Sequence, residues 1–163
     1  MNLIVACDKN YGIGIDNSLP NWKIDGDLKR FRELTTGDGN NIVIMGRNTF
    51  ESLPNGPLKN RLNIVISRKY SEIEFAKQIQ SSIKCFKSLE DAFKFSIDYT
   101  KDSGEIWVIG GSQIYEESVK LKLINKFFIT KLKDEYKCDT FLGPLTIDYI
   151  NNNSDNIVQF EVY

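Results

Sequence analysis

Short runs rich in β-branched residues alternate with amphipathic stretches along this chain, and this alternation most limits its fold. Strands interleaved with helices favour a largely parallel, twisted sheet with helices on both faces. The runs that predict strands are residues 3–7, 42–45, 62–67, 83–86, 106–109, 127–132 and 157–163. The stretches that predict helices are residues 25–35, 47–53, 89–100 and 113–121. The sequence therefore predicts an α/β fold.

The end of the chain departs from this alternation. Two predicted strands are joined there by a long polar loop through residues 151–156, which predicts an antiparallel strand at the C-terminal edge of the sheet. The chain has 163 residues, 41% of them hydrophobic, without an internal repeat or a low-complexity linker. We therefore expect a single domain over residues 1–163.

The chain contains no histidine, and this absence excludes much of enzyme chemistry. Ser–His–Asp and Cys–His nucleophile systems need an imidazole, which is also the commonest ligand of transition metals. The cysteines Cys7, Cys85 and Cys138 form no C-x-x-C pair, so we expect no metal site. An enzyme of this composition would take its protons from carboxylates, Lys, Tyr or water, and its hard chemistry from an organic cofactor.

The charge balance and the cysteine content predict which partners the chain has and in which compartment it is found. The net charge is −1, from 21 basic and 22 acidic residues, so we expect no general attraction to nucleic acid or to an anionic membrane. We recognise no secretory signal, and no apolar stretch is long enough to span a bilayer. Three scattered cysteines argue against a disulfide framework and predict a reducing, cytoplasmic location.

Asp27 does not fit the pattern of the first predicted helix. At ~100° per residue, one arc of the helical wheel holds the apolar residues Ile24, Leu28, Phe31 and Leu34. Asp27 falls inside this arc, between Phe31 and Leu34. An acidic residue in a first turn is favoured by the helix dipole and needs no function. Alternatively, the carboxylate faces a pocket, where it can trade a proton. The wheel leaves both interpretations open.

Two predicted strands end in glycine-containing turns that lead into helices, namely Gly46-Arg47-Asn48-Thr49 and Gly110-Gly111-Ser112. Each turn would place free backbone N–H groups at the carboxyl end of a strand, where open α/β sheets bind phosphates. Either one alone is better explained as a tight turn, and the two together make an anion or dinucleotide site an equally good interpretation. The segment Gly12-Ile13-Gly14 is not followed directly by a helix, so we reject it as a dinucleotide fingerprint.

A local basic group accompanies these turns. Arg47 opens one predicted helix, and Ser67-Arg68-Lys69 follows another strand. If the two strand ends are neighbours, a phosphate monoester could be held between them by charge-assisted hydrogen bonds. Otherwise these residues are solvated surface charges, the usual state of Arg and Lys.

Several short motifs follow one another in register between residues 3 and 139. They are Ile4-Val5-Ala6, Gly12-Ile13-Gly14, Leu19-Pro20, Trp22, Asp27-Leu28 with Phe31, the run from Ile44 to Ser52, Arg61 with Asn63 and Ser67, Ile109-Gly110-Gly111 with Tyr115, Thr130, and Asp139-Thr140-Phe141. Together they resemble the dihydrofolate reductase family. The resemblance implies NADPH-dependent reduction of 7,8-dihydrofolate to 5,6,7,8-tetrahydrofolate, which supplies one-carbon metabolism and thymidylate synthesis.

The resemblance also implies roles around the substrate. Asp27 would hydrogen-bond the pterin ring and assist protonation of N5, after hydride transfer to C6, with Thr130 supporting the carboxylate. Leu19 and Trp22 belong to the flexible loop that would close over the nicotinamide and exclude water. Arg61 would pair with the α-carboxylate of the substrate's glutamate. The remaining substrate contacts would come from Ile4, Val5, Ala6, Leu28, Phe31, Leu53 and Ile109.

On the cofactor side, the resemblance implies that the Gly110–Gly111 peptide is cis and that two helix starts share the pyrophosphate of NADPH. Arg47, Ser67 and Arg68 would bind the 2′-phosphate, which favours NADPH over NADH. The other expected cofactor contacts are Ala6, Ile13, Gly46, Asn48, Thr49, Ser112, Gln113, Ile114 and Tyr115. Small-molecule partners would be dihydrofolate and antifolate inhibitors, and we expect a monomer because no additional interface element is visible.

Some positions depart from the family pattern. Asn21 separates Pro20 from Trp22, and Asn60 precedes Arg61 where glycine is common. Phe50 stands where tryptophan is frequent, and Gln113 where some bacterial members carry arginine.

Two alternatives to this function stay open. A pyrimidine reductase of riboflavin synthesis would share the cofactor half of the fold, but the spacing of Trp22, Asp27 and Arg61 argues against it. The other alternative is a non-catalytic binding module that keeps the fold.

Overall fold

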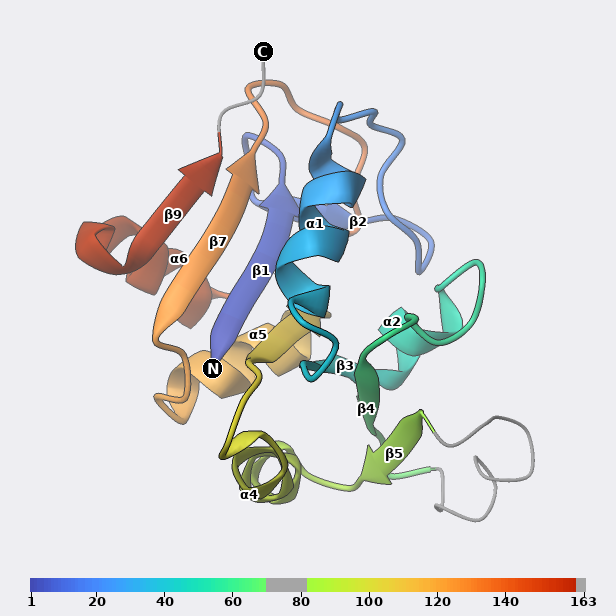
Figure 1. The fold of residues 1–163 in the computed structure, drawn as a ribbon. Helices are drawn as coiled ribbons and strands as arrows, with labels where there is room; N and C mark the ends of the chain where they lie inside the picture. The colour runs from blue at the N-terminus through green and yellow to red at the C-terminus, as the bar shows by residue number, and fades with distance from the viewer. Residues whose placement is uncertain (70–81, 161–163) are drawn as a thin grey trace.

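The computed structural model describes residues 1–69 and 82–160, and its main feature is a strongly twisted seven-stranded sheet (Figure 1). The strand order is β5-β4-β3-β6-β1-β7-β9, and every neighbouring pair is parallel. The strands are β1 (Asn2–Cys7), β3 (Ile42–Gly46), β4 (Leu62–Ile66), β5 (Ile83–Phe86), β6 (Ile106–Gly110), β7 (Lys126–Lys131) and β9 (Ile157–Phe160). The predicted α/β class with a mostly parallel sheet is confirmed.

Helices cover both faces of the sheet. One face carries α1 (Asp27–Thr36) and α2 (Arg47–Glu51), and the other carries α4 (Leu89–Thr100), α5 (Ser112–Lys120) and α6 (Pro144–Asn152). Predicted helix positions agree with these bounds to within two residues. The first helix begins two residues later than predicted, because Gly26 has φ of 78°, in the left-handed region, and cannot continue a right-handed helix.

The antiparallel addition is made by different strands from those the sequence indicated. β2 (Gly12–Gly14) pairs antiparallel with β8 (Thr140–Phe141) in a separate two-stranded sheet. The C-terminal strand β9 does lie at the edge of the main sheet, but it runs parallel to β7, so the expected antiparallel orientation was wrong. The cause is α6, which the sequence analysis missed and which returns the chain across the sheet before β9. Residues 161–163 of that predicted strand lie outside the described residues.

The hydrophobic core has two parts, one on each side of the sheet. The cluster on the α4–α5–α6 side includes Leu3, Val5 and Cys7 of β1, and the cluster on the α1–α2 side includes Val43 and Met45 of β3. Such alternation is expected of a strand buried on both faces. No helix within the described ranges is long and apolar enough to cross a membrane.

Candidate active site

The sheet topology selects one place for a ligand. The chain leaves β1 toward β3 with α1 on one face, whereas it leaves the neighbouring strand β6 toward β7 with α5 on the other face. Ligands of open α/β sheets bind at such a switch point, beside the carboxyl ends of the strands. Ala6 lies near the end of β1 and Gly110 ends β6, so residues from two predicted motifs meet at this edge.

Asp27 is held at this edge by a residue of the sheet. It is the first residue of α1, and its side chain is 23% exposed. From β7, the hydroxyl of Thr130 donates a 2.9 Å hydrogen bond to Asp27 Oδ1, across 103 residues of sequence. Thr130 is paired with Ala6 of β1, so the bond fixes the carboxylate near the ends of both strands. Asp27 therefore occupies the first turn of the helix and also points toward the sheet edge.

A cation that the helical wheel did not indicate lies beside this carboxylate. Arg30 Nη1 is 3.8 Å from Asp27 Oδ1, and Arg30 Cζ lies 3.9 Å above the ring of Phe160. Phe160 is paired with Thr130 in the sheet, so the end of β9 supports the same group of residues. The spacing of three residues along α1 is the only signal in the sequence for this ion pair.

Apolar side chains lie next to Asp27 in the sequence and on the same side of the sheet. Leu28, the next residue, is 74% exposed. Ile4, Leu53 and Ile109 are half-buried and pack against the same core cluster on the α1–α2 side. The structure does not bring the Val5 side chain to this face, because strand alternation directs it into the opposite cluster.

Tyr115 links the helix that follows β6 to the neighbouring strand β1. Its hydroxyl donates a 2.7 Å hydrogen bond to the carbonyl oxygen of Ile4. Burial, and then the nearby Cys7 thiol, raise the pKa of Tyr115 far above its ordinary value, so the hydroxyl stays a donor. Ile114 and Tyr115 are both buried in the core, which leaves only their backbone groups for the predicted cofactor contact.

Arg61 is fixed before any ligand binds. It is 8% exposed, its Nε donates to the carbonyl oxygen of Lys59 (2.8 Å), and its Nη1 donates to Thr35 Oγ1 (2.9 Å). The Thr35 hydroxyl in turn donates to the carbonyl oxygen of Phe31 (2.7 Å) in α1. Burial, and then the positive charge of Arg32, lower the pKa of Arg61. Its remaining N–H groups face a pocket of about 600 Å³.

The two glycine turns lie together, as a shared anion site requires. A Cβ atom built on Gly111 would lie 3.4 Å from Thr49 Oγ1, so the starts of α5 and α2 approach one another closely. Neither helix has a side-chain cap at its N-terminus. The Gly110–Gly111 peptide is cis, as the resemblance implied. Ser112, however, donates its hydroxyl to the carbonyl oxygen of Phe141 (2.6 Å) and is already bonded.

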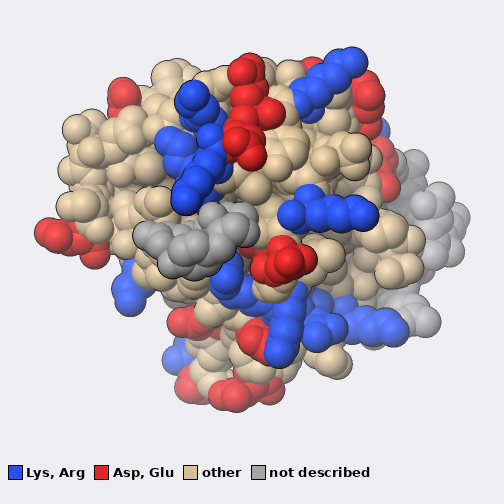
Figure 2. Space-filling model, turned by 90° about the horizontal axis from the view of Figure 1, so that it is seen from above, with Lys and Arg blue, Asp and Glu red and all other residues tan. Residues whose placement is uncertain are grey.

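The basic residues of the sequence analysis follow neighbouring strands. Gly46 is paired with Ile66, so Arg47 and Ser67 emerge side by side from β3 and β4. Ser67 is buried, and its hydroxyl accepts from the backbone N–H of Lys69 (3.1 Å), whereas Arg68 is exposed. Arg47 Nη1 lies 3.7 Å from Glu51 Oε1. Cations and carboxylates are interspersed on the face toward which β1, β7 and β9 point (Figure 2), so anion binding depends on individually placed cations.

The loop after β2 carries the two other expected catalytic residues. Leu19 is 66% exposed, and Trp22 packs edge-on against Tyr136, with ring centroids 5.6 Å apart. Asp139 Oδ2 accepts a 3.0 Å hydrogen bond from the backbone N–H of Asp16, which ties this loop to the strand β8 region. Ile13 packs in part against the core on the α5 side, and Gln113 is exposed.

Comparison with known proteins adds a decisive observation, because the dihydrofolate reductase family model matches residues 1–158. The chain belongs to the dihydrofolate reductase family. The dihydrofolate reductase of Drosophila melanogaster is 39% identical over 150 residues, which cover 88% of this chain and 79% of that protein. The dihydrofolate reductase of Rattus norvegicus is 35% identical over 156 residues, which cover 91% and 81%.

The family also contains longer relatives. A bifunctional dihydrofolate reductase-thymidylate synthase of Paramecium tetraurelia is 38% identical over 142 residues, which cover 87% of this chain. The matched residues span 28% of that relative's length. The similarity to the bifunctional protein is therefore confined to a small part of it.

Three departures from the dihydrofolate reductase pattern have a structural explanation. Asn21 sits at the centre of a three-residue turn, in which the backbone N–H of Trp22 donates to the carbonyl oxygen of Pro20 (2.8 Å). Asn60 has φ of 60°, in the left-handed region where glycine is favoured and asparagine is tolerated. At Asn21 and Asn60, the local backbone conformation therefore accommodates the departure from the family pattern. Phe50 is buried in the α1–α2 cluster, where an aromatic exchange keeps the packing.

Sequence reasoning missed several residues of the site, namely Arg30, Arg32, Thr35, Lys59, Tyr136 and Phe160. Thr35 had a weak signal, because it lies four residues after Phe31 and therefore on the same face of α1. Arg30 had a similar signal, because it lies three residues after Asp27. Tyr136 and Phe160 act through contacts with distant segments, and no local pattern marks such contacts.

Proposed function

We propose that this protein reduces 7,8-dihydrofolate to 5,6,7,8-tetrahydrofolate with NADPH. The observation that carries the proposal is the Asp27 carboxylate, held by Thr130 at the switch point and flanked by the exposed Leu28. A carboxylate with apolar neighbours complements a flat ring that presents two N–H donors on one edge, as the 2-amino group and N3 of a pterin do. Family membership and the named relatives support the same substrate.

The residues at the two glycine turns fit a dinucleotide. Uncapped N-termini of α2 and α5 offer backbone N–H donors and a favourable dipole to a pyrophosphate. Side chains at Gly110 and Gly111 would fill the space that opens toward Thr49, so glycine keeps the cradle accessible. Arg47, Ser67 and Arg68 would hold the 2′-phosphate. When bound, NADPH supplies the hydride that C6 of the pterin accepts.

The chain's own residues would then orient the substrate and supply its proton. Asp27 would bind the 2-amino group and N3, and would assist delivery of a proton to N5 through water. Thr130 keeps the carboxylate in one orientation, and Arg61 would take the α-carboxylate of the substrate's glutamate at the other end. Leu19 and Trp22 would close the loop over the site and exclude water.

A kinetic assay with purified protein, NADPH and dihydrofolate tests this proposal through the fall in absorbance at about 340 nm, a property of NADPH oxidation. Asp27→Asn should cut turnover at neutral pH by about 100-fold or more, with partial rescue at low pH, and should leave NADPH binding nearly intact. Asp25→Asn, which changes an exposed carboxylate two residues away, is the matched control.

Two results would overturn the proposal. Near-wild-type turnover in Asp27→Asn would remove Asp27 from proton delivery. A folded protein that binds NADPH but does not oxidise it with dihydrofolate would be the non-catalytic binding module instead.

A further inference from the structure

Asp8 is a buried carboxylate to which the proposed reaction assigns no role. It directly follows β1 and is fully buried, and within residues 1–69 and 82–160 it forms no ion pair. Burying a charge without a cation is costly unless hydrogen bonds replace the lost water. Three backbone N–H groups replace it here, those of Asn10, Gly12 and Tyr136. The role of this carboxylate is therefore to hold segments of the chain together.

The two oxygens of Asp8 hold two different segments. Oδ1 accepts from Asn10 (2.9 Å) and Gly12 (2.7 Å) in the connection from β1 to β2, whereas Oδ2 accepts from Tyr136 (2.9 Å) in the connection from β7 to β8. A Cβ atom built on Gly12 would lie 2.5 Å from Cys138 Sγ and 3.0 Å from Asp8 Oδ1, so the two connections are in close contact at this point. Asp8 is therefore the junction between them.

The bond to Tyr136 explains why this position needs a carboxylate. A side chain with one acceptor oxygen can make the local bonds to Asn10 and Gly12, as an asparagine does in an Asx turn. The bond to Tyr136 uses the second oxygen and spans 128 residues. In asparagine the second atom is an NH2 group, which would face the N–H of Tyr136 as donor against donor. Because two bonds outweigh one, Asp8→Asn should keep the local bonds and break the long-range one.

Tyr136 transmits this constraint to the loop that carries Leu19 and Trp22. Its ring packs edge-on against Trp22, with the ring centroids 5.6 Å apart and the ring planes at 89°. The hydrogen bond from Asp16 to Asp139 holds an earlier part of the same loop. Because an edge-to-face pair depends on the position of both rings, a displaced backbone at Tyr136 would also displace Trp22.

We propose that Asp8 is a positioning residue for hydride transfer, because it fixes the backbone of Tyr136, whose ring supports Trp22 in the loop that would close over the nicotinamide. The inference rests on the proposed function, since the loop has this task only if NADPH and dihydrofolate bind at the site. Asp8 acts through Tyr136 and not through a ligand contact. Its loss should therefore slow the reaction of bound ligands, which depends on loop closure, without weakening the binding of NADPH at the glycine turns.

NMR of Asp8→Asn tests the structural part of this inference. Hydrogen exchange at the Tyr136 amide should become about tenfold faster, and exchange at the Gly12 amide should change less. The indole N–H signal of Trp22 should shift, because the ring of Tyr136 no longer lies beside it in one orientation. Trp107, the other tryptophan, is buried in the core, and its signal should stay in place.

Single-turnover kinetics with NADPH and dihydrofolate test the functional part. We expect hydride transfer to be about tenfold slower in Asp8→Asn, while the Kd of NADPH changes by less than about twofold. Tyr136→Leu removes the ring and leaves Asp8 in place, so it should slow hydride transfer to a similar extent even if Asp8→Asn does not fold. The double variant should be no slower than Tyr136→Leu, because the two residues act through one path. Glu135→Gln, at the exposed position before Tyr136, is the control.

The outcomes separate this inference from the proposed function. A wild-type rate of hydride transfer in Asp8→Asn or in Tyr136→Leu would overturn the inference, and so would losses that multiply in the double variant. No oxidation of NADPH by the wild type with dihydrofolate would instead overturn the proposed function. The NMR measurement would then still decide whether Asp8 positions Trp22, and unchanged exchange at Tyr136 in Asp8→Asn would overturn that as well.

Discussion

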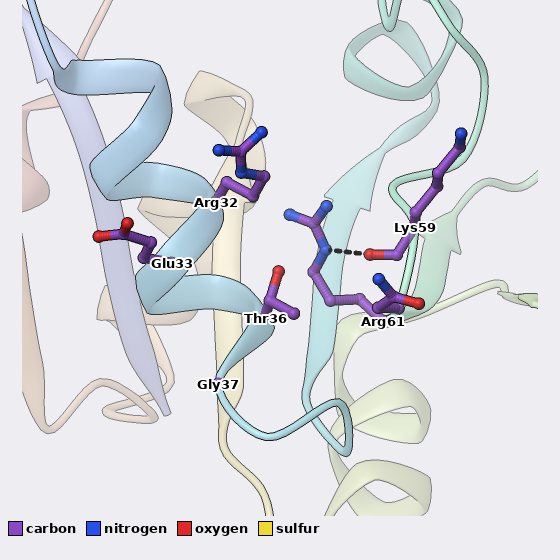
Figure 3. Close-up of a pocket in the computed structure, with 7 residues that line it drawn as sticks. Arg32, Glu33, Thr36, Gly37, Lys59 and Arg61 are labelled. Carbon is purple, nitrogen blue, oxygen red and sulfur yellow. Dashed lines mark hydrogen bonds between the residues drawn. The ribbon is translucent and has the colours of Figure 1, made fainter.

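The hydroxyl of Thr35 joins Arg61 to the backbone of α1, accepting from Nη1 at 2.9 Å while donating to the carbonyl oxygen of Phe31 at 2.7 Å. Thr35 is fully buried, so no water replaces its hydroxyl readily. The orientation of the Arg61 guanidinium, which would hold the substrate's glutamate, therefore depends on Thr35, a residue that does not line the pocket that Arg61 faces (Figure 3).

Replacing this hydroxyl should weaken substrate binding. We expect Thr35→Val to raise the KM for dihydrofolate by about tenfold, because Arg61 loses a fixed orientation, and to lower the free energy of unfolding by about 1–3 kcal/mol, because a buried donor loses its partner. Thr35→Ser keeps the hydroxyl and should preserve the KM. The measurements are steady-state kinetics and urea unfolding, and a wild-type KM in Thr35→Val would contradict the assigned role.

Arg47 should contribute to the choice between NADPH and NADH. Arg47 and Ser67 emerge side by side from paired strands, so removal of this guanidinium should weaken binding of a 2′-phosphate and leave a 2′-hydroxyl unaffected. We expect Arg47→Ala to narrow the ratio of kcat/KM values for NADPH and NADH by on the order of tenfold. Lys101→Ala, at an exposed position after α4, is the control. An unchanged ratio would mean that the 2′-phosphate site lies elsewhere.

Asp139 should control local opening of the loop that carries Leu19 and Trp22. Hydrogen bonds from the backbone N–H of Asp16 and from the Thr140 hydroxyl lower the pKa of Asp139. Asp139→Asn removes the charge from this acceptor, so the amide hydrogen of Asp16 should exchange with solvent about tenfold faster.

Protonation should have the same effect as this substitution. Because the pKa of Asp139 is lowered in the folded chain, the protection at Asp16 is present at neutral pH and lost as pH falls through the lowered value. Hydrogen exchange followed by NMR measures both effects, with Asp134→Asn, an exposed residue in the same connection, as the control. Equal exchange rates at Asp16 in Asp139→Asn and the wild type would show that the loop is held by other contacts.

Glu116 of α5 should stabilise the start of α6 in a pH-dependent way. Its carboxylate accepts from the backbone N–H groups of Leu145 (2.8 Å) and Thr146 (3.1 Å) and from the Thr146 hydroxyl (2.8 Å). Burial opposes ionisation, but these bonds outweigh it and lower the pKa of Glu116. The stabilisation is therefore complete above the pKa of the unfolded chain, about 4.3, and is lost as pH falls through the lower folded value.

We expect Glu116→Gln to lower the Tm by about 2–4 °C at neutral pH, as loss of a helix cap does in a chain of this size. The difference from the wild type should disappear in acid, where Glu116 is protonated. Glu117→Gln, at the next position of α5, should have little effect at either pH. Differential scanning calorimetry at the two pH values measures both, and a pH-independent difference would show that the carboxylate charge is not involved.

Where the sequence predicted the fold correctly, a single physical cause was strong and local. Ile42, Val43, Ile44 and Met45 are fully buried because β3 is covered on both faces, so their continuous apolar run marks the strand. β2 and β8 have three and two residues, too few to show a period, and each exists only by pairing with the other. α6 was missed because its asparagine-rich end has low helix propensity, whereas Glu116 of another helix holds its start.

In the candidate site, too, the sequence predicted the residues that a local pattern marks and missed those that distant contacts position. Asp27 was conspicuous because it interrupts an apolar arc, and the glycine turns were conspicuous because they follow strands. The partners that position these groups were not predictable, since Thr130 lies 103 residues from Asp27 and the Arg61–Thr35 bond spans 26 residues. Strand alternation was available from the sequence and directs the Val5 side chain to the core cluster on the α4–α5–α6 side, whereas the expected contact of Val5 with the substrate rested on the family motif alone.

No two neighbouring strands of the seven-stranded sheet are joined by a hairpin, and β1 pairs only with β6 and β7. During synthesis on the ribosome, β1 must therefore wait for about 100 further residues before either of its partners exists, which takes roughly 5–20 s at ordinary elongation rates. Its apolar run stays unpaired throughout that interval. The strand whose end lies at the candidate site is thus the one most exposed to wrong association while the chain is being made.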